Sequence, residues 1–157
     1  MAKDQLFDEK FAARITESIH GLHVQIPTMV IRKVGDLETA AFIGFAVFLS
    51  SCCKDEDGWF FLEQDKEPDP DNKSMFRRLG SWRAAVGLGK DAQQRARRRL
   101  EKLGLLAPLP SERQKRLGNG SSEPSQAVFI LEQKRGAPQR LHYRVDLVRY
   151  LTWLGSE

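Results

Sequence analysis

The sequence predicts a mainly α-helical fold with one small antiparallel β-hairpin. An apolar run that follows Asp36 has the length and composition of a buried helix. Residues 74–103 contain two helical patterns joined by a glycine-containing turn, which is a helix-turn-helix in outline. Residues 127–145 contain two β-rich segments around a short turn. With 157 residues, of which 41% are hydrophobic, the chain has the size of one globular domain with appendages.

The first 34 residues are expected to form a helical appendage. Phe7, Phe11, Ile15 and Ile19 recur at intervals of four, which predicts an amphipathic helix. Residues 28–34 could add one or two helical turns before Gly35, a helix breaker. The domain proper is expected over residues 35–154.

The domain is expected to begin with a core helix. Asp36 can cap this helix, and residues 40–49 have almost no polar side. We therefore favour a central core helix over a ligand-binding role, although a partner surface could use the excess of apolar residues. Asp57 and Gly58 then indicate a turn and residues 59–62 a short strand, followed by a solvated acidic loop over residues 63–73.

The helix-turn-helix pattern covers residues 74–103. Ser74 starts a first helix that extends to about Val86, and Gly87 and Gly89 form the turn. The second helix, Lys90–Leu103, has one stripe of small or apolar residues, and Gly104 supplies its stop signal before a strand begins. The stripe consists of Ala92, Ala96, Leu100 and Leu103.

Positive charge is concentrated in this part of the chain. Residues 77–102 carry nine basic and two acidic side chains, whereas residues 1–76 carry eight basic and fourteen acidic ones. A solvated helix face is one explanation for the run RARRR. The position after a glycine-containing turn favours DNA instead, with Arg97 and Arg98 on phosphates. Gln93 and Gln94 would then contact base edges, since Gln can bind adenine through two hydrogen bonds.

The last third of the chain is expected to contain a loop, a hairpin and a helix. Residues 107–126 are rich in Pro, Gly and Ser and predict a flexible loop. Residues 127–132 form the first predicted strand, residues 135–138 the turn, and residues 141–145 the second strand. A terminal helix follows, with enough apolar residues to pack on the domain or on a second copy.

Several functional classes are excluded by what the sequence lacks. The longest apolar run has ten residues, too few to span a bilayer, and no signal core is present, so we expect a cytoplasmic protein without membrane contact. The adjacent Cys52 and Cys53 are expected to be free thiols, and the three histidines have no zinc-finger spacing, so neither a metal nor a cofactor is expected.

No catalytic motif is found either. The segment GLGKD has Asp91 where a phosphate-binding loop requires Ser or Thr after Lys90, and no HExxH motif or nucleophile elbow occurs. The carboxylates of residues 55–71 lie in a loop with nothing to raise a pKa. We therefore expect a protein that is not an enzyme.

The segments LETAAFIGFAVFLSS, DGWF, SWRAAVGLGKDAQQRARRRLEKLGLL and KRGAPQRLHYRVD occur in the order found in winged-helix proteins. More specifically, the chain resembles a group of replication-associated or uncharacterised DNA-binding proteins of bacteriophages, plasmids and integrative elements, which are similar in layout to replisome-organiser amino-terminal domains. The resemblance covers residues 35–154, and the acidic insertion at 61–73 and the loop at 108–126 depart from it. It implies a winged helix-turn-helix, mainly α with a small antiparallel β wing and with extra N- and C-terminal helices.

In such proteins the segment Lys90–Leu103 is the recognition helix and the hairpin is the wing. The candidate DNA-binding residues are therefore Lys90, Gln93, Gln94, Arg97, Arg98, Lys134, Arg135 and Arg140. We expect a non-enzymatic, nucleoid-associated protein of a bacterial mobile element that binds double-stranded DNA as a homodimer in replication initiation or transcriptional control. The alternative is an interaction module on the same scaffold that binds a replisome or host-defence protein.

Overall fold

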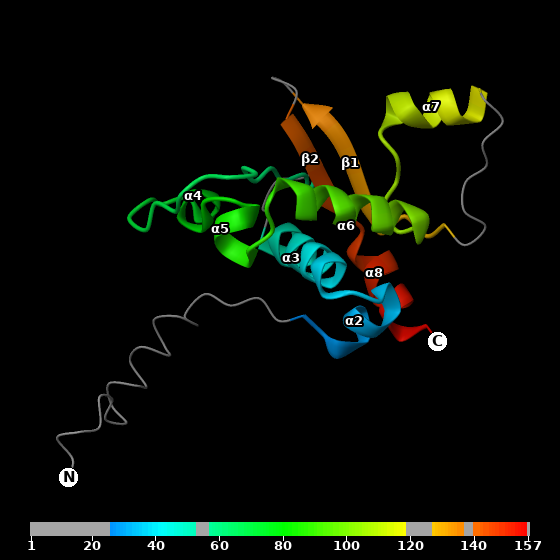
Figure 1. The fold of residues 1–157 in the computed structure, drawn as a ribbon, viewed down its shortest axis with the longest axis horizontal. Helices are drawn as coiled ribbons and strands as arrows, with labels where there is room; N and C mark the ends of the chain where they lie inside the picture. The colour runs from blue at the N-terminus through cyan, green and yellow to red at the C-terminus, as the bar shows by residue number, and fades with distance from the viewer. Residues whose placement is uncertain (1–25, 53–56, 119–126, 137–139, 157) are drawn as a thin grey trace, which may run out of the picture.

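The computed structural model describes residues 26–52, 57–118, 127–136 and 140–156, with the backbone alone at 113, 114, 116 and 117. The described part is mainly helical with a two-stranded antiparallel sheet, as the sequence predicts (Figure 1). The elements are α2 (Thr28–Val34), α3 (Leu37–Cys52), α4 (Met75–Leu79), α5 (Trp82–Val86), α6 (Lys90–Lys102), α7 (Pro110–Gly118), β1 (Leu131–Gly136), β2 (Arg140–Val145) and α8 (Leu147–Gly155). The helix expected over residues 7–19 lies outside the described residues.

Helix α3 is the centre of the fold and packs against α2, α6 and β2. Asp36 caps it as expected: its carboxylate accepts hydrogen bonds from the Thr39 amide at 2.7 Å and the Thr39 hydroxyl at 2.8 Å. Gly35, with φ of 89°, ends the preceding α2. Eight residues of α3 are buried, which confirms the predicted core helix, and Val30 and Val34 of α2 belong to the same core.

Aromatic side chains from three parts of the chain form the middle of this core. The rings of Phe42 and Trp82 are stacked, with centroids 4.5 Å apart and planes at 8°. Phe45 meets Trp82 edge-on at 5.2 Å, and Tyr143 meets Phe42 edge-on at 5.5 Å. Such pairs contribute about 0.5–1.5 kcal/mol each beyond the area they bury. The cluster therefore joins α3, α5 and β2 beneath α6.

The first helix of the predicted helix-turn-helix is in fact two short helices, so the expectation of one continuous helix from Ser74 is wrong. Gly80 separates α4 from α5 with φ of 82° and ψ of −70°, which is not helical. Ser81 then caps α5, because its side chain accepts a hydrogen bond from the Ala84 amide at 3.1 Å.

The turn before α6 and the extent of α6 agree with the prediction. Gly87 has φ of 74°, and Gly89 precedes the first residue of α6. Gly104, with φ of 73°, follows its end. The strand expected after Gly104 is reduced to a single bridge between Leu106 and Leu131.

The segment 107–126 was expected to be a loop throughout, and this is wrong for residues 110–118, which form α7. Proline is favoured in the first turn of a helix, and α7 begins at Pro110. Glu112 lies in the first turn, where the helix dipole favours a negative charge, and basic residues follow it. Residues 119–126 are outside the described part of the chain.

The hairpin exists as predicted, but its first strand starts later. In the register, Leu131 pairs with Val145 and Gly136 pairs with Arg140, so residues 135 and 136, expected in the turn, belong to β1. Residues 127–130 are not in a strand, because the amides of residues 128 and 129 donate to the Gly104 carbonyl at 2.9 and 3.0 Å.

The strand predicted over residues 59–62 is also shorter than expected. The described structure has one antiparallel bridge there, in which Phe60 and Tyr143 exchange backbone hydrogen bonds of 2.9 and 3.0 Å. This bridge still places residues 59–63 beside β2. Alternate residues of the segment therefore lie on opposite sides of the hairpin sheet.

Helix α8 ends the described chain and packs beside α2. Asp146 caps it by accepting a hydrogen bond from the Arg149 amide at 3.0 Å, and Tyr150 is buried. The Lys33 ammonium lies 5.3 Å from the centre of the Trp153 ring and donates to the Ser156 carbonyl. The opposite side of α8 exposes apolar residues: Leu147 is 39%, Val148 75% and Leu151 65% exposed.

Candidate nucleic-acid interface

The arginines of α6 point to different neighbours, although they are almost consecutive in sequence. Arg95 forms two hydrogen bonds with the Glu38 carboxylate, of 2.9 and 3.1 Å. Arg99 donates to the Val34 carbonyl at 3.3 Å. Both therefore lie on the side of α6 that adjoins α2 and the start of α3. The hydrogen bond from Arg95 lowers the pKa of the Glu38 carboxyl, so this pair stays charged.

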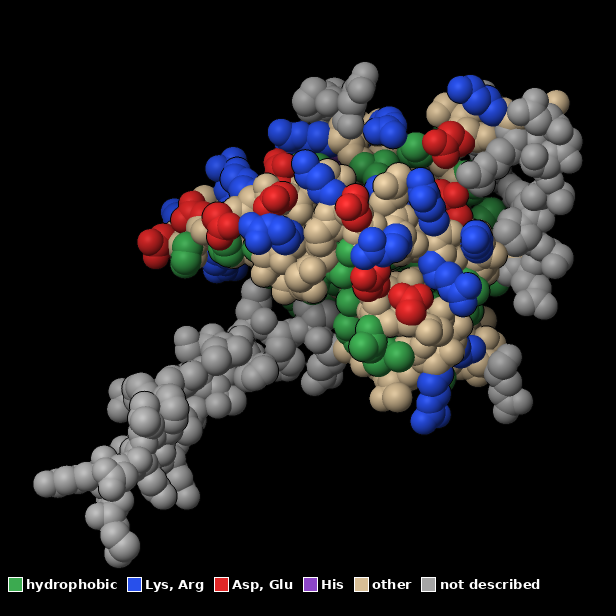
Figure 2. All heavy atoms as spheres, in the orientation of Figure 1, with side chains coloured by type: hydrophobic (Ala, Val, Ile, Leu, Met, Phe, Trp, Pro, Cys, Tyr) green, Lys and Arg blue, Asp and Glu red, His purple; other side chains and the backbone are tan. Residues whose placement is uncertain are grey.

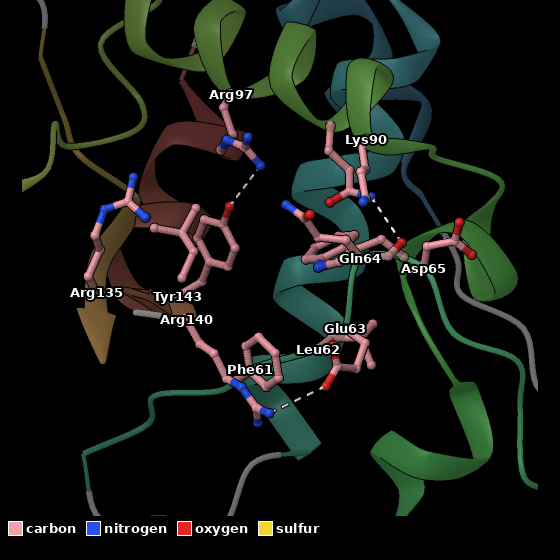
Figure 3. Close-up of a pocket in the computed structure, with 13 residues that line it drawn as sticks. Phe61, Leu62, Glu63, Gln64, Asp65, Lys90, Arg97, Arg135, Arg140 and Tyr143 are labelled. Atoms are coloured by element: carbon pink, nitrogen blue, oxygen red, sulfur yellow. Dashed lines mark hydrogen bonds and ion pairs between the residues drawn. The ribbon is translucent and has the colours of Figure 1, made fainter. Parts of the chain in front are cut away.

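A hollow of about 480 Å³ lies on the other side of α6, between this helix and the hairpin (Figure 3). Four cationic side chains line it: Lys90 and Arg97 come from α6, Arg135 from β1 and Arg140 from β2. All four were predicted as DNA-binding residues from sequence. The structure thus brings together residues separated by up to fifty positions in the chain.

Tyr143 forms part of the wall of this hollow and holds Arg97 in place. The Tyr143 side chain is buried, with 3% of its surface exposed, and its hydroxyl accepts a hydrogen bond from Arg97 at 3.3 Å. Burial raises the pKa of the Tyr143 phenol, so the ring remains neutral at physiological pH. The neutral phenol thus adds no negative charge beside Arg97 and fixes one of its donors.

A second hollow of about 370 Å³ continues the first one along α6. Arg97, Arg135 and Leu141 line both hollows, so the two are parts of one groove. Gln94 and Arg98, both exposed and both predicted as site residues, line the second part. We call the two hollows together the basic groove. Figure 2 shows Lys and Arg side chains along α6 and over the hairpin, with acidic side chains among them.

Gln93 does not lie in the position that the sequence suggested. It lines the first hollow, but the expectation that it is on the exposed side of α6 is wrong, because only 1% of its surface is accessible. Its amide donates to the carbonyls of Leu88 at 2.8 Å and Gln64 at 3.3 Å. The buried residues of α6 are Gln93, Ala96 and Leu100, at helical spacings of three and four, so the buried stripe is rotated slightly from the predicted one.

Lys134 does not line the groove and lies on the opposite side of the hairpin from Arg135. Successive strand residues point to opposite sides of a sheet, and Arg135 is on the side that meets α6, so Lys134 is on the other side. There its ammonium lies 4.2 Å from the centre of the Trp59 ring, and the Arg144 guanidinium lies 4.7 Å from the same ring. Both contacts are cation–π interactions that fix the outer surface of the hairpin.

Sequence reasoning missed the acidic residues of the groove. Glu63 and Asp65 line the first hollow and Glu101 and Glu112 line the second, and the Glu63 carboxylate lies 3.9 Å from Arg140 (Figure 3). Arg140 also lies 4.9 Å from the centre of the Phe61 ring. The alternation of Phe60 and Leu62, which are buried, with Phe61 and Glu63, which are not, was the only signal in the sequence that could have indicated this placement.

No family model, curated protein or solved structure matches this chain. Among the described residues, no group of histidine, cysteine and carboxylate side chains could hold a metal ion. The helices in the same part of the chain include none that is long and apolar enough to cross a membrane. Cys52 is an exposed free thiol, and Cys53 lies outside the described residues.

Proposed function

We propose that this protein is a non-enzymatic, double-stranded-DNA-binding protein with a winged helix-turn-helix arrangement. In this proposal α5, the turn at Gly87–Gly89 and α6 form the helix-turn-helix, and β1 and β2 form the wing. The observation that carries the proposal is the basic groove, in which cations from α6 and from both strands face one space. Two separate elements that present positive charge to one groove suit the phosphates on the two sides of a DNA groove.

The positions of the groove residues suggest that some contact phosphates and others contact base edges. Lys90, Arg97, Arg135 and Arg140 would neutralise phosphates, which supplies affinity without sequence preference. Gln94 is exposed in the second turn of α6, next to Arg98, and is the residue best placed to contact a base edge. We therefore assign any base recognition to Gln94, and count Arg98 among the residues that neutralise phosphates.

The biological role that we propose follows from the sequence resemblance. A DNA-binding protein of this kind would act in replication initiation or transcriptional control of a bacterial mobile element, in the cytoplasm. A protein-interaction module is the second candidate, and the exposed Leu147, Val148 and Leu151 on α8 favour it. The two candidates differ in the surface that binds the partner. DNA would bind in the groove, whereas a protein partner would bind on α8.

The test compares two charge-matched double variants on a fluorescently labelled duplex, with binding followed by anisotropy at several salt concentrations. Arg98→Ala with Arg135→Ala removes two groove cations, whereas Arg95→Ala with Arg99→Ala removes two cations from the other side of α6. We expect the groove variant alone to lower the magnitude of the slope of log affinity against log salt, by about 1.8, since each phosphate contact contributes about 0.9. Equal losses in both variants would contradict the groove assignment, and undetectable binding of the unmodified protein at low salt would contradict DNA binding itself.

A further inference from the structure

The acidic segment between the Phe60 bridge and α4 is attached firmly to α5. The Trp82 amide donates to the Glu63 carbonyl at 3.0 Å, and the Arg83 amide donates to the Gln64 carbonyl at 3.3 Å. The Ser81 hydroxyl donates to the Lys66 carbonyl at 2.9 Å. A segment whose composition predicts a solvated loop is therefore held by three hydrogen bonds to consecutive residues at the start of α5.

Two further features fix the position of this segment. A Cβ atom on Gly80 would lie only 2.7 Å from the Lys66 carbonyl oxygen, so the close approach of the two backbones depends on glycine. Arg83 binds Asp65 at 2.5 Å and Glu67 at 2.8 Å through two different nitrogens. The carboxylates thus have a defined place relative to α5 and, through α5, relative to α6.

That place is the end of the basic groove nearest to Lys90 and Arg140. Glu63 and Asp65 line the groove together with these cations, and Glu63 is 3.9 Å from Arg140. The side chains of Glu63 and Arg140 are 41% and 50% exposed, so water screens their attraction and a phosphate can displace the carboxylate. The groove is therefore a site where carboxylates and an incoming phosphate would compete for the same cations.

We propose that Glu63 and Asp65 are specificity-determining residues of the basic groove, which weaken its binding to duplex DNA of arbitrary sequence. This inference rests on the proposed DNA binding. A phosphate that enters this end of the groove has to displace the Glu63 carboxylate from Arg140, and it meets the Asp65 carboxylate, which Arg83 holds in place. Phosphate contacts supply most of the affinity for non-specific DNA, so their weakening leaves a larger share of the binding to contacts with base edges.

The experiment measures the affinity of Glu63→Gln and Asp65→Asn variants for a labelled duplex of random sequence at several salt concentrations. Asp71→Asn is the matched control, because it changes the net charge equally from the same segment without lining the groove. We expect each groove variant to bind about threefold to tenfold more tightly than the control near 0.1 M salt, where one phosphate contact corresponds to about eightfold. For Glu63→Gln, the slope of log affinity against log salt should become steeper by up to about 0.9, because Arg140 is then free to contact a phosphate.

Two results would overturn the inference while DNA binding itself stands. If the groove variants and Asp71→Asn bind alike, the carboxylates have only a general charge effect. If Glu63→Gln or Asp65→Asn binds DNA more weakly, the carboxylate accepts hydrogen bonds from bases instead of opposing phosphates. Failure of the proposed function is distinguishable, since then the unmodified protein does not bind the duplex and Arg98→Ala with Arg135→Ala changes nothing.

Discussion

Gln93 and Gln94 are neighbours on α6, but the structure predicts a structural role for Gln93 and a DNA-binding role for Gln94, which replacement of each by Ala can distinguish. The Gln93 side chain is buried and donates to the Leu88 carbonyl at 2.8 Å, whereas its neighbour Gln94 is exposed on the groove side. Sequence composition alone gives the two residues the same function. The structure predicts that Gln93→Ala lowers the stability of the fold and that Gln94→Ala alters DNA binding.

The size of the effect at Gln93 can be worked from its contacts. Loss of the buried hydrogen bond leaves the Leu88 carbonyl without this donor, at a cost of about 1–3 kcal/mol. Loss of the side-chain methylene from the core adds about 0.8 kcal/mol to this cost. The better helix propensity of Ala offsets a few tenths of a kcal/mol. The free energy of unfolding should therefore fall by about 1.5–3.5 kcal/mol. For a chain of this length that lowers the melting temperature by about 3–14 °C.

Thermal and urea unfolding, followed by circular dichroism, measure this difference directly. Gln94→Ala is the matched control, and its unfolding free energy should stay within about 0.5 kcal/mol of the original because the residue is exposed. At 10 °C below its own midpoint, Gln93→Ala should retain the DNA preference of the unmodified protein. A fully stable Gln93→Ala variant that has lost this preference would refute the reasoning.

Three further predictions concern other parts of the molecule. Gly80→Ala should lower the unfolding free energy by about 1–3 kcal/mol, because φ of 82° is strained for Ala and its Cβ would meet the Lys66 carbonyl; an unchanged urea midpoint would contradict this. Burial raises the pKa values of Tyr143 and Tyr150 above the ordinary 10.0, so the unfolded chain loses these protons first. The stability that they contribute should thus be complete at neutral pH and fall as pH rises above about 10, and Tyr143→Phe should reduce the fall measured by thermal unfolding. Leu151, 65% exposed on α8, is expected in a homodimer contact, so light scattering should give twice the chain mass for the unmodified protein and a lower mass for Leu151→Asp, whereas a monomer at high concentration would contradict the dimer.

The elements that are controlled by local signals could be predicted from the sequence. The Asp36 cap, the glycines at 87 and 89, and the apolar content of residues 40–49 act through neighbouring backbone. Helix α3 begins directly after Asp36, and α6 ends one residue before the expected Leu103. The break at Gly80 was missed because its φ depends on the approach of residues 66–68, which are distant enough in sequence to be invisible to a periodicity argument. The start of β1 was misplaced because the Gly104 carbonyl holds residues 128 and 129.

The candidate site was predicted in part for a similar reason. A cluster of basic residues on a helix after a tight turn is visible in sequence, and it put Lys90 and Arg97, which line the groove, among the candidate residues. Which arginine joins the groove depends on tertiary neighbours: Glu38 binds Arg95, and Tyr143 binds Arg97. Gln93 shows the limit of a helical-wheel argument, since the buried stripe keeps the predicted Ala96 and Leu100 but includes Gln93 in place of Ala92.

The three tryptophans lie in three different environments, so tryptophan fluorescence can report on three separate parts of the protein. Trp82 is stacked in the aromatic core, Trp59 lies under cations on the outer hairpin, and Trp153 lies under Lys33 at the contact of α2 with α8. Variants that keep one tryptophan and replace the other two by Phe would report separately on the core, the hairpin and the terminal helices. Coincident unfolding curves would mean one cooperative unit, and separate curves would show which part opens first.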